Sequence, residues 1–165
     1  MARTVLGALL GVLLFVLTVN ADRAGRRSLN GLQALRVEVV VSGPEPAEAA
    51  SLGSMLQTNV ELRLRQNRVR VQENVEGIPG RPVLRIIVVL YKNPEGIDVY
   101  AISAWGGLEQ DVLLHRNKSQ ARAGTWRSYI SVGLTNSGAF RDSVRENVSG
   151  IVDEFVNDFL AENPR

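Results

Sequence analysis

The sequence contains no cysteine. This absence excludes disulfide bonds, so the stability of an exported form would depend on the hydrophobic core alone. It also excludes the acylated cysteine that anchors bacterial lipoproteins. A plain leader without any cysteine favours a bacterial envelope protein over a eukaryotic secreted one.

Lysine is almost as scarce, with Lys92 and Lys118 against seventeen arginines. The formal net charge is +2, and removal of Arg3 with a leader would lower it by one. So small an excess is not typical of a protein that binds polyanions, and we predict no nucleic-acid partner. An arginine bias along the whole chain is typical of a GC-rich genome and points to no particular site.

His115 is the only histidine. On a strand it would share one face with Glu109 and Asp111, and these are residue types that bind zinc. Residues two apart on a strand lie about 6.6 Å from one another, so the three cannot converge on one ion unaided. Ser119 and Thr125 flank a nearby loop without a nucleophile motif. We therefore predict no catalytic residue, no bound metal and no cofactor.

The opening segment has the form of a secretory signal. An uncharged apolar core at residues 5–19 follows Arg3, and Val19-Asn20-Ala21 fits the small-residue cleavage rule. Fifteen residues reach about 22 Å, short of the roughly 30 Å of bilayer hydrocarbon. We predict that residues 1–21 are a cleaved signal peptide and that the protein is periplasmic.

Two features favour the alternative, in which residues 4–21 stay as an inner-membrane anchor. Arg23, Arg26 and Arg27 follow the core, and such charges tend to remain on the cytoplasmic side. Gly7 and Gly11 have the GxxxG spacing of helices that associate in membranes. Either outcome associates the protein with the envelope.

Hydrophobic periodicity predicts the elements in the rest of the chain. Two helices have core-facing stripes, at residues 46–64 and at about residues 140–162. Pro46 suits the start of the first helix, and Asn163-Pro164 ends the second. Strands are predicted, from their alternation or apolar runs, at residues 35–41, 69–71, 83–91, 97–114 and 126–134.

Within residues 97–114 the apolar set is Ile97, Val99, Ala101 and Trp105, and it shifts to Leu108 after Gly106-Gly107. A glycine pair at a change of parity predicts a β-bulge at Gly106-Gly107. The run at residues 83–91 is nearly all apolar, which predicts a strand in the middle of the sheet. The opposite sheet face would carry the polar set Arg36, Glu38, Asp98 and Tyr100.

The predicted fold class is α+β, a two-layer sandwich of order β-α-β-β-β-β-α. Both amphipathic helices would cover one face of a mostly antiparallel sheet. Residues 22–32 are predicted to be a linker, and residues 33–165 a single domain.

Arg63, Arg65, Arg68 and Arg70 form the densest cluster of charge. Cations near a helix C-terminus oppose the helix dipole, which is a structural role. The functional alternative is a patch for an anionic partner, such as a lipid head group.

The element order, leader and final helix resemble small envelope accessory domains of Gram-negative bacteria. Examples are the amino-terminal domain of the Tol–Pal translocation protein and the lipopolysaccharide-assembly lipoproteins. The segment GTWRSYISVGL at residues 124–134, leading into VDEFVNDFLAENP, is similar to uncharacterised exported bacterial proteins. The resemblance implies an envelope function and assigns no functional residue.

Three functions remain open from the sequence. The first is a non-catalytic domain that binds an envelope protein or lipid component through its exposed sheet face or an edge strand. The second is a carrier or sensor of a small amphiphile. The third is a hydrolase or metal enzyme that uses His115. The sequence leaves the oligomeric state open.

Overall fold

The computed structural model describes residues 25–95 and 97–164. The elements follow the order β1 (Arg36–Ser42), α2 (Pro46–Gln66), β2 (Val83–Lys92), β3 (Tyr100–Leu113), β4 (Gln120–Arg127), β5 (Ser131–Thr135) and α3 (Phe140–Glu162). The predicted order β-α-β-β-β-β-α is confirmed.

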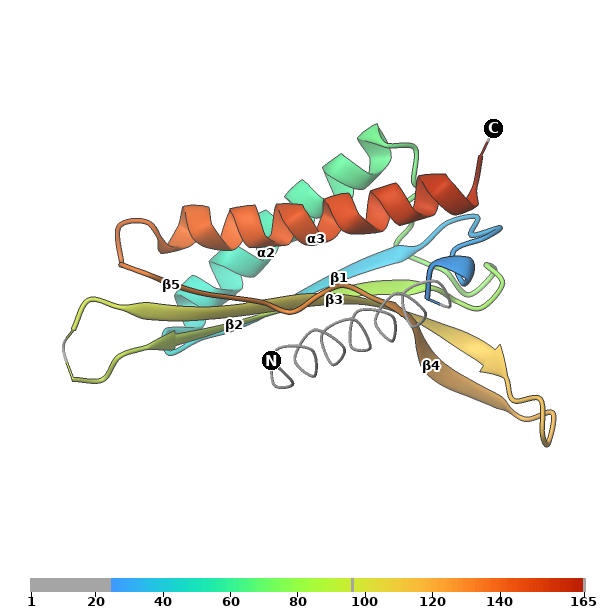
Figure 1. Cartoon of the computed structure of the whole chain (residues 1–165), viewed down its shortest axis with the longest axis horizontal. Coiled ribbons are helices and arrows are strands. Elements are labelled where there is room, and N and C mark those ends of the chain that lie inside the picture. Colours follow the sequence, from blue (N-terminus) through green and yellow to red (C-terminus); the bar gives the residue numbers. More distant parts are fainter. Residues whose placement is uncertain (1–24, 96, 165) are drawn as a thin grey trace, which may run out of the picture.

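The sheet has the strand order β1-β2-β3-β4, and β5 pairs with β3 beyond the end of β4. β1 and β2 are parallel, and the other pairs are antiparallel. Both long helices cover the same face of this sheet (Figure 1). The two-layer α+β prediction is therefore confirmed, including the central position of residues 83–91 in β2.

The core lies between the helices and the sheet. The α2 stripe of Leu52, Leu56, Val60 and Leu64 is buried, as the four-residue spacing predicts. Pro46 begins this helix, where its missing N–H group costs no hydrogen bond. On α3 the buried side chains are Phe140, Val144, Val148, Ile151, Val152, Phe155 and Val156. Asn163 follows the last turn of α3, as predicted.

β3 is continuous through the glycine pair. Before the pair its inward parity is the opposite of the predicted one, whereas Leu108, after the pair, is buried as predicted. Tyr100 is buried, whereas Ala101 and Trp105 lie on the other face, so the predictions for these residues were wrong. The physical reason is the packing of α3. Tyr100 stacks on Phe140 with ring centroids 4.9 Å apart, and Gly106 lets α3 approach the strand closely.

The irregularity in β3 pairing lies one step beyond the glycines. The β2–β3 register runs unbroken through Gly106 and Gly107. The shift occurs in the pairing with β4, where Leu108 faces Trp126 and Glu109 faces Gly124, so Thr125 is the extra residue. This β4 bulge, rather than the predicted one at the glycine pair, keeps Trp126 directed into the core.

Two predicted strands differ from the structure. Residues 69–71 form only an isolated bridge, from Val71 to Leu35. The predicted strand at residues 126–134 is divided into β4 and β5, with Ser128 between them. Ser128 exchanges hydrogen bonds with Gly106, because its N–H group donates to the Gly106 carbonyl and its hydroxyl accepts from the Gly106 N–H group. These bonds hold the chain where it passes from one strand to the next.

Part of the predicted linker packs on the domain. Leu29 is fully buried in the core, and the Asn163 side chain donates a hydrogen bond to its carbonyl oxygen. The predicted signal peptide or anchor lies outside the described residues. Among residues 25–164, with Gly96 excluded, no helix is long and apolar enough to cross a membrane.

Candidate functional site: the open face of the sheet

The face of the sheet opposite the helices carries several exposed large apolar side chains. Alternate residues of β1, β2, β3 and β5 point to it, and strand pairing sets them in rows across the sheet. Three adjacent rows are apolar apart from Ser42 and Ser103: Val40, Ile87 and Trp105; Ser42, Val89, Ser103 and Val132; and Tyr91, Ala101 and Leu134. We call these rows the apolar half of the open face.

The apolar half is open to solvent. Tyr91 is 61% exposed, Val132 74% and Leu134 77%. The largest apolar patch on a typical soluble monomer is about 300–600 Å² and often has a function. Here several large and well exposed side chains lie in neighbouring rows of one sheet. The apolar half is therefore a candidate contact surface.

The other half of the open face is a network of ion pairs. Arg85 reaches Glu109 at 2.7 Å and Glu38 at 2.9 Å. Arg122 reaches Asp111 at 3.2 Å and also pairs with Glu109. Arg81, from the loop before β2, donates a further hydrogen bond to Asp111. We call these six residues the charged half.

Among these six residues, three guanidinium groups face three carboxylates. Two further arginines lie beside them, since Arg36 is 3.9 Å from Glu38 and Arg127 lines the adjoining hollow. The hydrogen bond from Arg81 holds the pKa of Asp111 below its usual value, and Arg122 adds to the effect against the opposing influence of burial. The same contact raises the pKa of Arg81, so both shifts favour the charged forms of this pair.

Trp105 lies at the border between the two halves. It faces Ile87 across the β2–β3 pair, and it lines a surface hollow of about 320 Å³ with Arg85, Arg122 and Arg127 among its walls. The sequence analysis placed Trp105 with the core set, and its position on the open face was missed. An indole at such a border can contact both an apolar partner and a cation.

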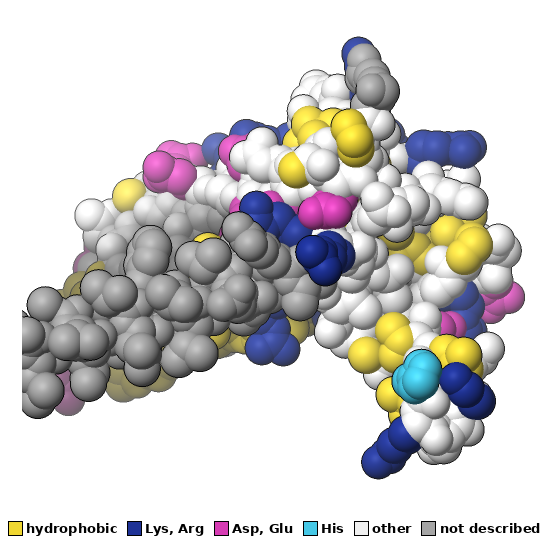
Figure 2. All heavy atoms as spheres, turned by 45° about the vertical axis from the view of Figure 1, so that its right-hand side comes forward, with side chains coloured by type: hydrophobic (Ala, Val, Ile, Leu, Met, Phe, Trp, Pro, Cys, Tyr) yellow, Lys and Arg dark blue, Asp and Glu magenta, His cyan; other side chains and the backbone are white. Residues whose placement is uncertain are grey.

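The structure does not gather the predicted metal-ligand types around His115. Glu109 and Asp111 are held in the charged half by arginines. His115 is exposed in the turn between β3 and β4, and Figure 2 shows it (cyan) on the projecting hairpin beside basic side chains. The described residues contain no group of three or more histidine, cysteine or acidic side chains placed to hold a metal ion.

The four arginines of the predicted anionic patch have different environments. Arg63 pairs with Asp153 of α3, and Arg65 with Glu61 one turn earlier. Arg68 has a positive φ of 67° just after α2, and Arg70 is exposed. Two of the four charges are thus neutralised within the fold. Binding of an anionic partner by this patch stays a prediction.

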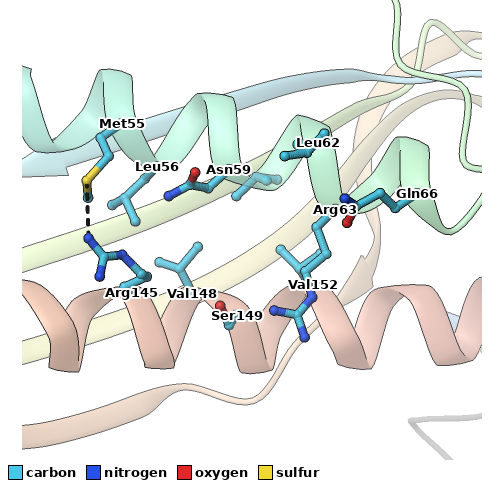
Figure 3. Close-up of a pocket in the computed structure, with 11 residues that line it drawn as sticks. Met55, Leu56, Asn59, Leu62, Arg63, Gln66, Arg145, Val148, Ser149 and Val152 are labelled. Atoms are coloured by element: carbon cyan, nitrogen blue, oxygen red, sulfur yellow. Dashed lines mark hydrogen bonds between the residues drawn. The ribbon is translucent and has the colours of Figure 1, made fainter.

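A second concave feature lies between the two helices. The groove has a volume of about 580 Å³, and its walls include Met55, Arg63 and Arg145 (Figure 3). Its floor consists of core side chains, among them Leu56 and Val152, that are almost completely buried. The floor therefore offers little free apolar surface to a ligand tail, and Arg63 and Arg145 already pair with Asp153 and Asp142.

The exposed pair on β5 was also missed from the sequence. Val132 and Leu134 share the parity of the buried Trp126, so they were assigned to one strand with it. The signal that distinguishes them is charge, because no charged residue occurs between Arg127 and Arg141. A charge-free run on an edge strand is uncommon unless the strand meets another surface.

No protein-family model matches this chain, and no curated protein sequence matches it. Among solved structures, PelC from Paraburkholderia phytofirmans, a dodecamer, is 16% identical, with a TM-score of 0.43 over 75% of this chain and 88% of that one. Lipoprotein GNA1162 from Neisseria meningitidis is 17% identical, with a TM-score of 0.39 over 74% of this chain and 99% of that one. The likeness to the Tol–Pal and lipopolysaccharide-assembly families stays a prediction. The structural neighbours thus include a bacterial lipoprotein, and at these identities and TM-scores they assign neither a family nor a function to the chain.

Proposed function

We propose that the protein is a non-catalytic, exported domain of the bacterial envelope that binds a partner protein through the apolar half of its open sheet face. The observation that carries the proposal is the row of exposed apolar side chains on this face, with Tyr91, Val132 and Leu134 each more than half exposed. Export is supported by the signal-like pattern of residues 1–21.

The shape of the face supports a protein partner over a small molecule. Sites for small ligands are concave and bury most of the ligand surface. The apolar half is instead made of adjacent rows of a sheet, with alternate side chains standing out from it. Such a surface suits the apolar centre of a protein interface, and the charged half beside it supplies a polar rim.

The pairing of charges supports a protein over an anionic membrane. Membrane-binding surfaces combine apolar side chains with unpaired Lys and Arg, which attract acidic lipids. Here Arg81, Arg85 and Arg122 each pair with a carboxylate, and Arg36 lies 3.9 Å from Glu38. A network of paired charges adds specificity for a partner with a matching polar rim.

The test is site-specific photocrosslinking in the bacterial envelope. A photoreactive phenylalanine analogue replaces Tyr91 in the full chain, and the matched control carries it at Leu62 on α2, which is 53% exposed outside the open face. We expect a discrete adduct with a second protein from position 91 and none from position 62. Val89→Lys in the same chain is expected to abolish the adduct.

Three outcomes would overturn the proposal. The same adduct from both positions would mean that the open face is not the contact surface. Adducts with lipid alone would replace the partner protein by the membrane. An adduct composed only of two copies of this chain would show that the face serves self-association.

A further inference from the structure

The outer edge of β5 has no partner in the described part of the chain. β5 pairs with β3 on one side, and its backbone makes no other hydrogen bond to the described residues. Half of the N–H and C=O groups of a strand in an antiparallel sheet point away from its neighbour. Native edge strands are normally protected by charges, proline or bulges, and β5, with the sequence SVGLT, has none of these.

The opposite edge of the sheet is closed. The Gln57 side chain accepts a hydrogen bond from the Val39 N–H group and donates one to the Val37 carbonyl, each at 3.0 Å. Its amide therefore occupies the positions that a neighbouring strand would use on β1. At the start of β1, the backbone of Leu35 is bonded to Arg70 and Gln72. A further strand cannot add there without displacing these groups.

The β4 part of the open edge is protected in the usual ways. It carries Arg122 and Arg127, and it is bulged at Thr125. The Ser28 hydroxyl also donates a hydrogen bond to the Thr125 carbonyl at 3.0 Å. β5 is thus the only named strand in the described chain that offers an uncovered and uncharged edge.

We propose that β5 pairs antiparallel with β5 of a second copy of this chain, about a two-fold axis at Gly133. The strand is self-complementary about this residue. Val132 of one copy would face Leu134 of the other on the open side, and Ser131 would face Thr135 on the helix side. Gly133 has no atom within 4 Å of the position a Cβ would occupy, so a side chain can be added there without a clash.

A second copy fits this edge better than an unrelated strand does. A charge-free edge selects no partner by charge complementarity, whereas its own two-fold image matches it side chain by side chain. Because the β1 edge is closed, such pairing ends at a dimer and does not propagate into a fibre. The inference shares Val132 and Leu134 with the proposed contact surface, but it concerns pairing through the backbone edge of β5, so its failure and that of the proposed function are distinguishable.

The absence of cysteine makes a direct test simple. Single cysteines are placed at each position from Ser131 to Thr135 of the full chain, and disulfide-linked dimers are measured after mild oxidation. A two-fold axis at Gly133 sets the two Cα atoms there about 4.5–5.5 Å apart, within disulfide range. At either neighbour the separation exceeds about 7 Å. Val40→Cys, on the same face at the β1 edge, is the matched control.

We expect the highest yield at Gly133→Cys, falling on both sides, and none above background at Val40→Cys. No linked dimer at any β5 position would overturn the inference. So would equal yields at all positions, which indicate random collision, and so would a maximum elsewhere in β5.

A second test needs no cysteine. In the double variant Val132→Lys/Leu134→Lys, position 132 of one copy faces position 134 of the other, so a lysine faces a lysine. The two-fold axis repeats this contact, which gives two such pairs in each dimer. Val132→Glu/Leu134→Lys has the same number of exposed charges but sets opposite charges there. Measured by sedimentation, the dissociation constant of the first variant should rise at least about tenfold, and that of the second should stay near the wild-type value.

A wild-type chain that is monomeric at all concentrations would overturn the inference, and equal dissociation constants for the two variants would do the same. Neither result bears on the proposed function, whose test positions lie on β2. Conversely, a Val89→Lys variant that loses the crosslinked partner and still forms the dimer would show that the partner-binding surface and the dimer interface are distinct.

Discussion

The two faces of the sheet are built from alternate residues of the same strands, yet they are governed by different constraints. On the covered face, Ile86, Val88, Ala104 and Leu108 are fully buried under the helices. On the open face, Val89 and Tyr91 of β2 are exposed. The open face as a whole is divided into an apolar half and a charged half. The covered face forms the core, whereas much of the open face is exposed to solvent.

The largest difference in stability between the two faces is expected when one tyrosine on each face is truncated. Tyr100 is 5% exposed and stacks on Phe140, whereas Tyr91 is 61% exposed. We expect Tyr100→Ala to lower the free energy of unfolding by about 3–5 kcal/mol, because it opens a cavity. Tyr91→Ala should change it by less than about 0.5 kcal/mol. Urea unfolding of both variants measures the difference, and equal losses would contradict it.

The adjacent glycines provide a second contrast. A Cβ added at Gly106 would lie 2.6 Å from Ile151 Cγ2 of α3, while the nearest atom at Gly107 would be 3.5 Å away. We expect Gly106→Ala to lower the free energy of unfolding by up to about 3 kcal/mol through overpacking. Gly107→Ala, on the open face, should have little effect. Thermal unfolding followed by circular dichroism checks both, and a stable Gly106→Ala variant would show that α3 can move away.

The corner between β4 and β5 provides a third contrast. The last even-numbered residue of β4 points to the helices, whereas the even-numbered residues of β5 point to the open face, and this change of parity occurs at the corner. Ser128 is buried, and its hydroxyl accepts a hydrogen bond from the Gly106 N–H group at 2.7 Å. Ser128→Ala leaves that buried donor without its acceptor and should cost about 1–2 kcal/mol of unfolding free energy. Ser131→Ala, whose partly buried hydroxyl contacts Asn147, is the control and should cost less. The reverse order, measured by urea unfolding, would contradict this role of Ser128.

The smallest effect is expected in the charged half. The hydrogen bond from Arg81 holds the pKa of Asp111 below its usual value. A lowered folded pKa stabilises the native state above the unfolded pKa, and this contribution is lost as pH falls through the folded value. Asp111→Asn should therefore be slightly less stable than the wild type at neutral pH and equal to it in strong acid.

Urea midpoints at the two pH values measure this effect, and Asp142→Asn is the control. The Asp142 side chain is 81% exposed beside Arg145, so no measurable change is expected at either pH. A difference between wild type and Asp111→Asn that grows in acid would contradict the assigned direction of the pKa.

Much of the fold was predictable because its helices show their buried stripe in the sequence. Leu52, Leu56 and Val60 recur at the helical period, and all are buried on α2. Alternation on the strands was less informative, because apolar residues occur on both faces of this sheet. Ala101 and Trp105 alternate as a core set would, yet they lie on the open face. Nothing local distinguishes the two parities.

The candidate site was only partly predictable. The sequence analysis named an exposed sheet face or an edge strand as the contact surface, but it assigned Val132 and Leu134 to the core strand of Trp126. The parity change happens at Ser128, whose hydrogen bonds to Gly106 join residues 22 positions apart. No window along the chain contains both partners of that contact.

The sequence by itself determined the two long helices, most of the strands and the absence of any disulfide, because these depend on local periodicity, proline position and composition. Only the tertiary structure decided which strand face meets the helices, which edge Gln57 closes and how the arginines of the open face are neutralised. Those outcomes depend on contacts between distant residues. The close approach of Ile151 to Gly106 and the stacking of Phe140 on Tyr100 fix which side of β3 is buried, and the open face is what remains.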